Sequence, residues 1–186
     1  MRTQYISVDV EASGPIPGDY NLLSIGLSVV GQEDDPEMCF YIELKPMNDN
    51  AVPEAMEHVG GLTLEGLKET GVDPKEALEQ VAAWIAKVTP KGFRPVQVAW
   101  PSSFDFMWTH WYFIHFLGTD PFGHSGVDMR SFAMGRTGLS FEDVSKRGLA
   151  RVGIRSRYSH THNALDDARG QGSIFSQLLR YLPRFS

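Results

Sequence analysis

The fold is decided by the stretch Tyr5-Ile6-Ser7-Val8-Asp9-Val10-Glu11-Ala12-Ser13-Gly14, close to the N-terminus. Its apolar first half is typical of a buried strand, and Gly14 allows a tight turn where the strand ends. Side chains alternate along a strand, so Asp9 and Glu11 point to one side while the valines point to the other. Neighbouring carboxylates repel each other unless they share a proton or a cation. An isolated pair of this kind is more often solvated at a sheet edge. Whether this pair belongs to a functional site therefore depends on the rest of the chain.

Composition sets the outer limits on the class of protein. The chain has 186 residues, of which 42% are hydrophobic, and this suits one domain over residues 1–186 with a sizeable core. The single cysteine, Cys39, allows no internal disulfide and favours a reducing compartment. We find neither a signal peptide nor an apolar run long enough to span a membrane, so we expect a soluble cytoplasmic protein. The net charge of −6 argues against a nonspecific nucleic-acid binder with a basic face.

Hydrophobic periodicity, turn residues and caps predict alternating strands and helices. After the first strand, further strands are expected at Asn21–Val30, Met38–Leu44, Arg94–Trp100 and Ser125–Val127. Helices are expected at Pro53–His58, Thr63–Glu69, Pro74–Val88 (capped by Asp73), Phe104–Phe116, Ser140–Val144 and Asn163–Leu182, with a loop over Leu149–Tyr158. Asp128, at the end of the fifth strand, is expected to cap a helix.

This order of elements predicts an α/β fold. Short turns join the first three strands, which indicates an antiparallel meander, and the later strands alternate with helices. The expected result is a mixed five-stranded sheet with helices on its faces and right-handed crossovers. The first strand would be central, which places Asp9 and Glu11 over the middle of the sheet.

Two more acids fall where the chain can bring them to this pair. Asp105 follows the fourth strand, and Asp167 lies near the start of the last helix. Four converging carboxylates require cations, and oxygen ligands suit Mg²⁺ or Mn²⁺ rather than zinc. Two such ions about 4 Å apart stabilise the attacking and leaving oxygens in phosphodiester hydrolysis. His162 precedes Asp167 by five residues, and its unperturbed pKa suits a general base.

With these residues in view, the chain resembles the DEDDh branch of the DnaQ-like 3′→5′ exonucleases, which includes RNase T and oligoribonuclease. The ordered set of three motifs carries the resemblance over nearly the whole chain. The motif D-x-E-x-x-G matches Asp9, Glu11 and Gly14; F-D matches Phe104-Asp105; and H-x-A-x-x-D-A matches His162, Ala164, Asp167 and Ala168. Trp100-Pro101 replaces the His-Asn pair of many relatives, and Val59-Gly60-Gly61-Leu62-Thr63 replaces a V-H-G-I-T run.

The resemblance implies a ribonuclease-H-like fold with helices on both faces of the sheet, a two-metal mechanism with Mg²⁺ or Mn²⁺, and release of 5′-monophosphates. It implies that Asp9, Glu11, Asp105 and Asp167 are metal ligands and that His162 is the general base. The implied substrate is single-stranded nucleic acid with a free 3′ end. Several relatives are dimers, so a homodimer is also an expectation, with the aromatic helix as one face.

Three residues are predicted to contact the substrate. Ser13 lies beside the acids and is a candidate for the terminal sugar. Most aromatic residues of Phe104–Phe116 have helical spacing and belong to a core, but Phe104 and Trp108 lie close enough to Asp105 to stack on a terminal base. Arg151, Arg155 and Arg157 are a solvated loop by default, or phosphate contacts because they precede His162.

The function predicted from these observations is a metal-dependent 3′→5′ exonuclease that favours RNA, because the chain looks like a stand-alone domain without a tail for docking to a polymerase. One alternative is a proofreading-type exodeoxyribonuclease. Another is a non-catalytic binding module that kept the fold, against which the intact set of acids argues.

Asp166 and Asp167 are adjacent, and only one of them is expected to belong to the metal site. Helical spacing from His162 favours Asp166 as the partner of that histidine. Asn163 is a good N-cap, however, and a carboxylate at Asp166 is then placed to reach back to the cap residue's backbone N–H. We therefore predict a structural role for Asp166 and assign Asp167 to the metal site.

Overall fold

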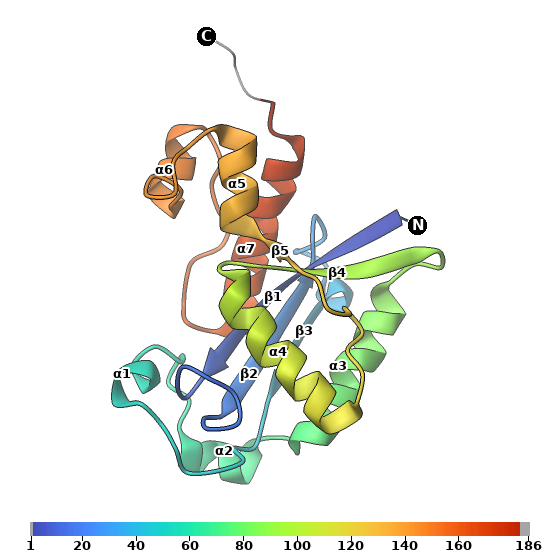
Figure 1. Ribbon diagram of the computed structural model, residues 1–186, viewed down its shortest axis with the longest axis vertical. Coiled ribbons are helices and arrows are strands. Elements are labelled where there is room, and N and C mark those ends of the chain that lie inside the picture. Colours follow the sequence, from blue (N-terminus) through green and yellow to red (C-terminus); the bar gives the residue numbers. More distant parts are fainter. Residues whose placement is uncertain (1, 183–186) are drawn as a thin grey trace.

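The computed structural model describes residues 2–182, and within them the chain forms one five-stranded sheet in the order β3-β2-β1-β4-β5 (Figure 1). The central strand β1 is antiparallel to β2 and parallel to β4, so the predicted mixed sheet and the central place of the first strand are both confirmed. The strands are β1 (Arg2–Ala12), β2 (Leu22–Val29), β3 (Cys39–Glu43), β4 (Phe93–Ala99) and β5 (Val127–Asp128).

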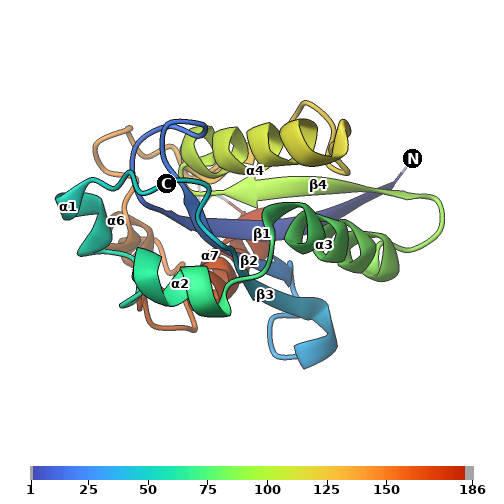
Figure 2. The same ribbon diagram turned by 90° about the horizontal axis from the view of Figure 1, so that it is seen from below.

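Helices cover both faces of this sheet. Helix α7 packs on β1, β2 and β3, while α3 and α4 lie on the opposite face (Figure 2). Within residues 2–182, none of the helices is both long and apolar enough to cross a membrane. The helices are α1 (Pro53–Met56), α2 (Leu64–Thr70), α3 (Pro74–Val88), α4 (Ser102–Leu117), α5 (Met129–Thr137), α6 (Lys146–Arg151) and α7 (Ala164–Arg180), with a short 3-10 helix η1 (Pro36–Met38).

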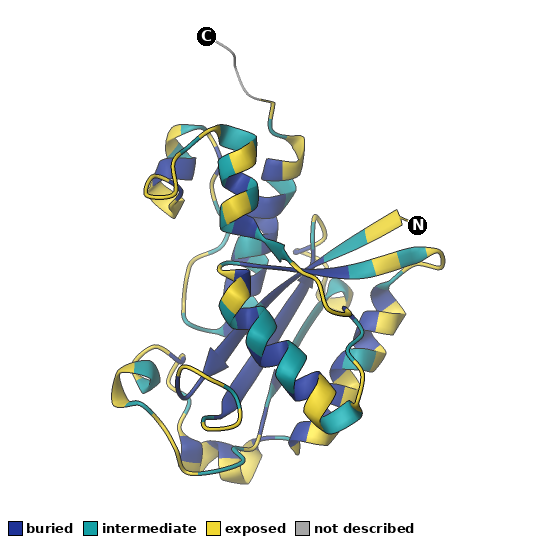
Figure 3. Cartoon of the chain, viewed as in Figure 1, coloured by how far each residue is buried: buried dark blue, intermediate teal, exposed yellow. Residues whose placement is uncertain are grey.

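Side chains alternate along β1, so its apolar core residues face one side of the sheet and its acidic residues face the other. Val8 and Val10 are buried in the apolar core beneath α4, where Trp108 and Tyr112 are also fully buried. Residues of the opposite parity face α7, as the contact between the rings of Tyr5 and Phe175 shows. Figure 3 shows β2 and the inner parts of β1 and β4 as buried, while the N-terminal part of β1 and the beginning of β4 are more exposed. Asp9 and Glu11 share this second parity, so β1 directs them to the face that α7 covers.

The segment between β5 and α7 differs from the prediction. Residues 129–137 form α5, which was not expected, and α6 (Lys146–Arg151) overlaps the start of the predicted loop at Leu149–Tyr158. The predicted helix at Ser140–Val144 is wrong, because the hydrogen bonds between Ser140 and Asp143 close only a turn. Ser145 starts α6 instead, since its hydroxyl accepts a hydrogen bond from the Gly148 N–H at 3.0 Å.

Asp128 has the capping role that the sequence indicates. Its Oδ1 accepts a hydrogen bond from the Ser131 N–H at 2.7 Å and so caps α5. Its Oδ2 accepts a second hydrogen bond from the Ser102 N–H at 3.0 Å, at the start of α4. One carboxylate therefore ties the first turns of two helices together.

Candidate active site

Three carboxylates from β1 and α7 meet at the centre of the sheet. Oxygen atoms of Asp9, Glu11 and Asp167 all lie within 4.8 Å of one another. Glu11 and Asp167 are buried, with 8% and 5% of their surfaces exposed, and Asp9 is half-buried. The predicted pairing of Asp9 and Glu11 on one side of β1 and the approach of Asp167 from the last helix are thus both present in the structure.

Asp105 reaches the cluster from the neighbouring helix α4. The pairing of β1 with β4 ends at Ser7 and Val98, so β4 does not extend to the backbone N–H of Val10. Asp105 accepts a hydrogen bond from that N–H at 3.1 Å with Oδ1, and only 3% of its surface is exposed. This bond fixes the fourth carboxylate beside the end of β1, as predicted from the adjacency of the two strands.

A glycine on β2 gives α7 its place on the sheet. Gly26 pairs with Asp9 across the strands, and a side chain on Gly26 would meet the backbone of Ala164 and Leu165 at 2.1–2.3 Å. The first turn of α7 therefore lies against the β2 backbone beside Asp9. The Asn163 side chain caps this turn by accepting hydrogen bonds from the N–H groups of Leu165 and Asp166, as predicted.

The pKa values of Glu11, Asp105 and Asp9 are raised, chiefly by burial. Burial, and then the negative charges of Asp167 and Asp105, raise the pKa of Glu11 to about 8. Burial also raises the pKa of Asp105 to about 7, against hydrogen bonds that favour the charged form. The pKa of Asp9 is well above its ordinary value, first because of burial and then because of the three other acids. The site therefore favours the binding of positive charge.

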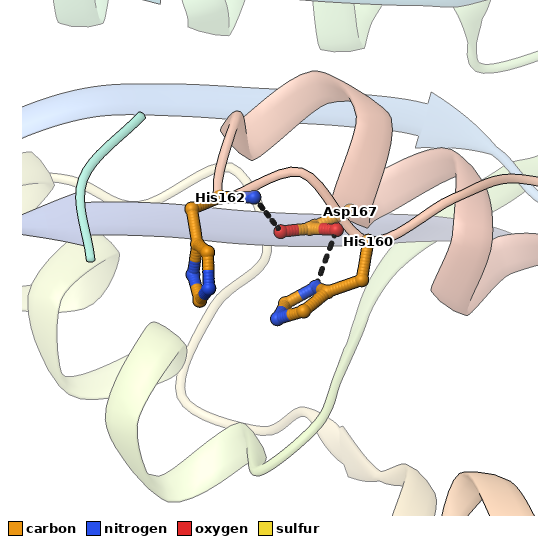
Figure 4. Close-up of side chains that lie close together, drawn as sticks. All are labelled: His160, His162 and Asp167. Carbon is orange, nitrogen blue, oxygen red and sulfur yellow. Dashed lines mark hydrogen bonds and ion pairs between the residues drawn. The ribbon is translucent and has the colours of Figure 1, made fainter. Parts of the chain in front are cut away.

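Three histidines line the opening of the cluster. The backbone N–H of His162 donates to Asp167 Oδ2 at 3.1 Å, and His160 Nδ1 lies 2.6 Å from Asp167 Oδ1 (Figure 4). The ring of His162 is 4.4 Å from that of His160 and 5.1 Å from that of His58, measured between centroids. His162 has a positive φ of 58°, an uncommon conformation that is often found at functional sites. His160 and His162 therefore lie beside Asp167, and His58 lies next to His162.

The neighbouring Asp166 has a structural contact, although not the one predicted. Its Oδ2 accepts a hydrogen bond from the Thr161 hydroxyl at 3.0 Å, and the Thr161 hydroxyl is 3.4 Å from the Asn163 N–H. The predicted direct return of Asp166 to the cap residue is therefore wrong, because Thr161 stands between them. Asp166 still supports the start of the helix, and Asp167 alone of the two joins the acid cluster.

Two of the three predicted substrate contacts do not fit the structure. Ser13 is fully buried, and its hydroxyl donates to Asn50 O at 2.8 Å while it accepts from the Asn21 N–H at 2.9 Å. These bonds give Ser13 a structural role in bracing the loop. Trp108 is also fully buried, because its position on α4 points into the core, so it has no surface on which a base could stack.

Phe104 is the predicted contact that the structure leaves accessible. It is half-buried and lines a largely apolar groove of about 450 Å³ together with Glu11 and His58. The groove lies directly beside the acid cluster, because Glu11 belongs to both. An aromatic wall next to a group of carboxylates is suited to a nucleobase attached to a phosphate.

Sequence reasoning missed one residue of this site and gave too little weight to another. Gln171 donates from Nε2 to Asp9 Oδ1 at 2.5 Å. It follows Asp167 by four residues on α7, so the shared helix face was a signal that could have found it. His160, two residues before His162, also lies directly against Asp167. No sequence pattern distinguishes it from an ordinary loop histidine.

The donor set fits a hard divalent cation. Carboxylate oxygens from Asp9, Glu11 and Asp167 are close enough to share one ion, and Asp105 is near enough to raise the pKa of Asp9. Mg²⁺ and Mn²⁺ both prefer such oxygen ligands. His160, His162 and Asp167 form a second group whose ligand atoms lie within 4.8 Å of one another, and it overlaps the first at Asp167.

Comparison with known proteins identifies the class. No family model matches the chain. A curated relative, the 3′-5′ DNA exonuclease Cap18 of Escherichia coli, is 39% identical over 178 residues, which cover 94% of this chain and 92% of the relative. The chain has the acids and the histidine of the DEDDh signature, and it belongs to the DEDDh family of 3′→5′ exonucleases.

Solved structures confirm the ribonuclease-H-like fold of this family. The nuclease domain of 3′hExo, a DEDDh family member bound to rAMP, has a TM-score of 0.75 at 13% identity, with 96% of this chain and 92% of that chain covered. Escherichia coli exonuclease I in complex with a dT13 oligonucleotide has a TM-score of 0.68 at 17% identity, with 97% of this chain but 42% of that chain covered. The protein is accordingly a 3′→5′ exonuclease.

Proposed function

We propose that this exonuclease removes nucleoside 5′-monophosphates from the 3′ end of single-stranded DNA and requires Mg²⁺ or Mn²⁺. The observation that carries the proposal is the convergence of Asp9, Glu11 and Asp167 within 4.8 Å, with Asp105 beside them. Burial, and for Asp9 and Glu11 also the repulsion between neighbouring carboxylates, raises the pKa values of Asp9, Glu11 and Asp105, so the cluster favours bound cations. Family membership supports the reaction, and the site supports dependence on a divalent metal.

In this proposal Asp9, Glu11, Asp105 and Asp167 hold two ions. When bound, the ions would supply the positive charge that stabilises the attacking and leaving oxygens of the phosphodiester. His162 takes the proton from the attacking water, because its ring lies at the accessible edge of the cluster beside Asp167. Gln171 holds Asp9 in a fixed orientation through its 2.5 Å hydrogen bond.

The groove beside Glu11 is the place for the terminal nucleoside. Phe104 stacks on the terminal base, and His58 lies on the side of the groove that is close to His162. The scissile phosphate then lies over the carboxylates, and the rest of the strand leaves on the other side of the cluster. This arrangement requires a free 3′ end, because the groove holds one end of the chain.

The choice of DNA reverses the preference for RNA that we infer from the sequence alone. The proposal is supported by the Escherichia coli relative, which is 39% identical and is named a DNA exonuclease. We expect faster degradation of a 5′-labelled DNA 20-mer than of the RNA 20-mer of the same sequence, both with Mn²⁺. Faster degradation of the RNA would instead support the preference for RNA that the sequence suggests. Full activity on either strand after exhaustive chelation would contradict the metal-dependent mechanism.

A second expected result concerns the end of the strand. Linear single-stranded DNA should be degraded from its 3′ end, while a closed circle of the same sequence should persist, because the circle offers no terminal nucleoside to the groove. The measurement is gel analysis of both substrates under the same conditions, with the same circle opened by a restriction enzyme at a site made double-stranded by an annealed oligonucleotide as the control. Efficient cutting of the intact circle would contradict attack at the 3′ end.

A third expected result concerns the general base. His162→Ala should lower kcat by roughly 10²–10⁴-fold, the contribution of a positioned base, with little change in the stabilisation by Mn²⁺. His162→Asn is a second variant, because asparagine tolerates the positive φ at this position better than alanine does. His124→Ala is the control, since His124 is exposed and its ring hydrogen-bonds the hydroxyl of the adjacent Ser125. If His162→Asn keeps wild-type kcat while His160→Ala loses it, the base has been assigned to the wrong histidine.

A further inference from the structure

Three arginines line a polar groove that lies outside the acid cluster. Arg155, Arg157 and Arg180 surround a hollow of about 490 Å³ beside α7, together with the single acid Glu33. The charged residues of this lining have a net charge of +2, in a chain whose formal net charge is −6. An isolated basic groove on an acidic protein indicates a site for an anionic partner.

The groove is built from a segment that is fixed to its neighbours. The chain between α6 and α7 runs beside α7, where Arg155 and Gln177 exchange two hydrogen bonds and the Arg157 N–H donates to Ser173 Oγ at 3.2 Å (Figure 1). On its other side, Arg157 forms an ion pair at 3.0 Å with Glu33, whose surface is only 1% exposed. The wall of the groove is therefore preorganised and not a loose surface loop.

The positive charges of two of the arginines are available to an anionic ligand. Arg157 is neutralised by Glu33 and Asp34. Arg155 and Arg180 are exposed and form no ion pair with any residue between 2 and 182, and Arg180 donates only to the neutral Ser176 hydroxyl at 2.9 Å. Guanidinium groups without a counter-ion in a shared groove are suited to phosphate oxygens.

The groove adjoins the active site at Ser156. Ser156 lines both the groove and a small cavity that Asp9, Asp167 and Lys146 also line. Asp167 and Arg180 are thirteen residues apart on α7, which corresponds to about 20 Å along the helix axis. At about 3.4 Å per stacked nucleotide, this distance spans roughly six nucleotides.

We propose that Arg155 and Arg180 bind backbone phosphates of the strand on the 5′ side of the scissile bond, so that the groove is a second binding site for single-stranded nucleic acid. The inference rests on the proposed function, because the groove is placed by its distance from the acid cluster. Its position next to the cavity that Asp9 and Asp167 line favours a nucleic-acid strand over an acidic peptide. Contacts to phosphate are independent of base sequence, so the groove contributes affinity and dependence on length.

The test is the double variant Arg155→Gln/Arg180→Gln, compared with Lys91→Gln/Arg94→Gln. The control removes two exposed cations from the region where β4 begins, at the opposite end of β1 from Asp9, and changes the net charge equally. Binding of a 5′-labelled DNA 20-mer is measured by fluorescence anisotropy in chelator, where no degradation occurs, at several salt concentrations. Turnover of a 20-mer and of a trimer is measured with Mn²⁺.

We expect the groove variant to bind the 20-mer roughly 25-fold more weakly at 0.1 M salt, since each contact with a single strand adds about 0.7 to the slope of log K against log salt. The slope should fall by about 1.4, KM for the 20-mer should rise, and kcat and the kinetics of the trimer should not change. An equal effect of both double variants, or no effect of the groove variant on the 20-mer, would overturn the inference. If the groove variant binds the 20-mer more weakly than the wild type, but the wild type does not degrade it, the proposed function is refuted. The groove would then remain supported as a binding site.

Discussion

Asp167→Asn is expected to abolish exonuclease activity while the fold stays intact, and Asp166→Asn is expected to retain activity. The two residues are adjacent, but α7 directs only Asp167 into the acid cluster, where its oxygens approach those of Asp9 and Glu11. Loss of this carboxylate removes a ligand from the proposed metal site. Removal of several kcal/mol of stabilisation from the transition state lowers the rate by about 10³-fold or more.

The fold should survive because the cluster is repulsive. Asp167 raises the pKa of Glu11 and of Asp9, so a neutral side chain at position 167 relieves strain between charges. Against this gain, the substituted asparagine side chain would lose part of the hydrogen bonding from His160 and the His162 N–H. We expect these effects to offset each other within about 1–2 kcal/mol.

Asp166→Asn changes a half-exposed contact, the hydrogen bond that the Thr161 hydroxyl donates to Asp166. An asparagine side chain can still accept this hydrogen bond. The expected cost is on the order of 1 kcal/mol or less, as for other helix-start contacts. The measurement combines turnover of a labelled DNA oligomer with thermal unfolding of both variants. An inactive Asp166→Asn together with an active Asp167→Asn would show that the assignment of the two aspartates is wrong.

The second large effect is a loss of stability of the metal-free protein as the pH rises. The pKa values of Glu11 and Asp105 are raised to about 8 and about 7 in the folded state, and that of Asp9 is raised in the same direction. The folded state therefore binds more protons than the unfolded state between about pH 4 and pH 8, so the free energy of unfolding falls as the pH increases through this window. The protonated acids contribute their full stabilisation at pH values below their pKa in the unfolded state. This contribution is lost at pH values above their pKa in the folded state.

We expect the loss between pH 5.5 and pH 8.5 to reach several kcal/mol, since each unit of pKa shift corresponds to about 1.36 kcal/mol. For a chain of this size the melting temperature in chelator should fall by roughly 10 °C over this range. Saturating Mn²⁺ should reverse the fall, because cations that bind the charged carboxylates stabilise the folded state. The increase in melting temperature caused by Mn²⁺ should therefore be larger at pH 8 than at pH 6.

The control for this experiment is the double variant Asp9→Asn/Glu11→Gln, whose melting temperature in chelator should depend much less on pH. The exposed Asp19 and Glu54 provide a matched pair, because Asp19→Asn/Glu54→Gln removes two carboxylates outside the cluster. A melting temperature of the wild-type protein that is flat or rises from pH 5.5 to pH 8.5 would contradict the raised pKa values. The absence of any Mn²⁺ effect would contradict a preformed metal site.

The local rules of chain geometry determined much of this protein from its sequence. Strand periodicity placed Asp9 and Glu11 on one face of β1, and the order of elements placed β1 between the antiparallel meander and the later strands. Asn163 and Asp73 marked the starts of their helices correctly, because a cap depends on contacts within one turn. The ordered acids and His162 were sufficient to predict the family that the Escherichia coli relative confirms.

Tertiary packing decided what periodicity leaves open. Phe104 and Trp108 share the same aromatic helix, but only the packing of α4 on the sheet shows that Trp108 is buried and that Phe104 faces the groove. The sequence likewise could not show that His160 lies against Asp167, nor that Arg155 and Arg180 share a groove. These contacts join residues whose side chains are oriented by separate elements, so their geometry is set by how those elements pack and not by spacing along the chain.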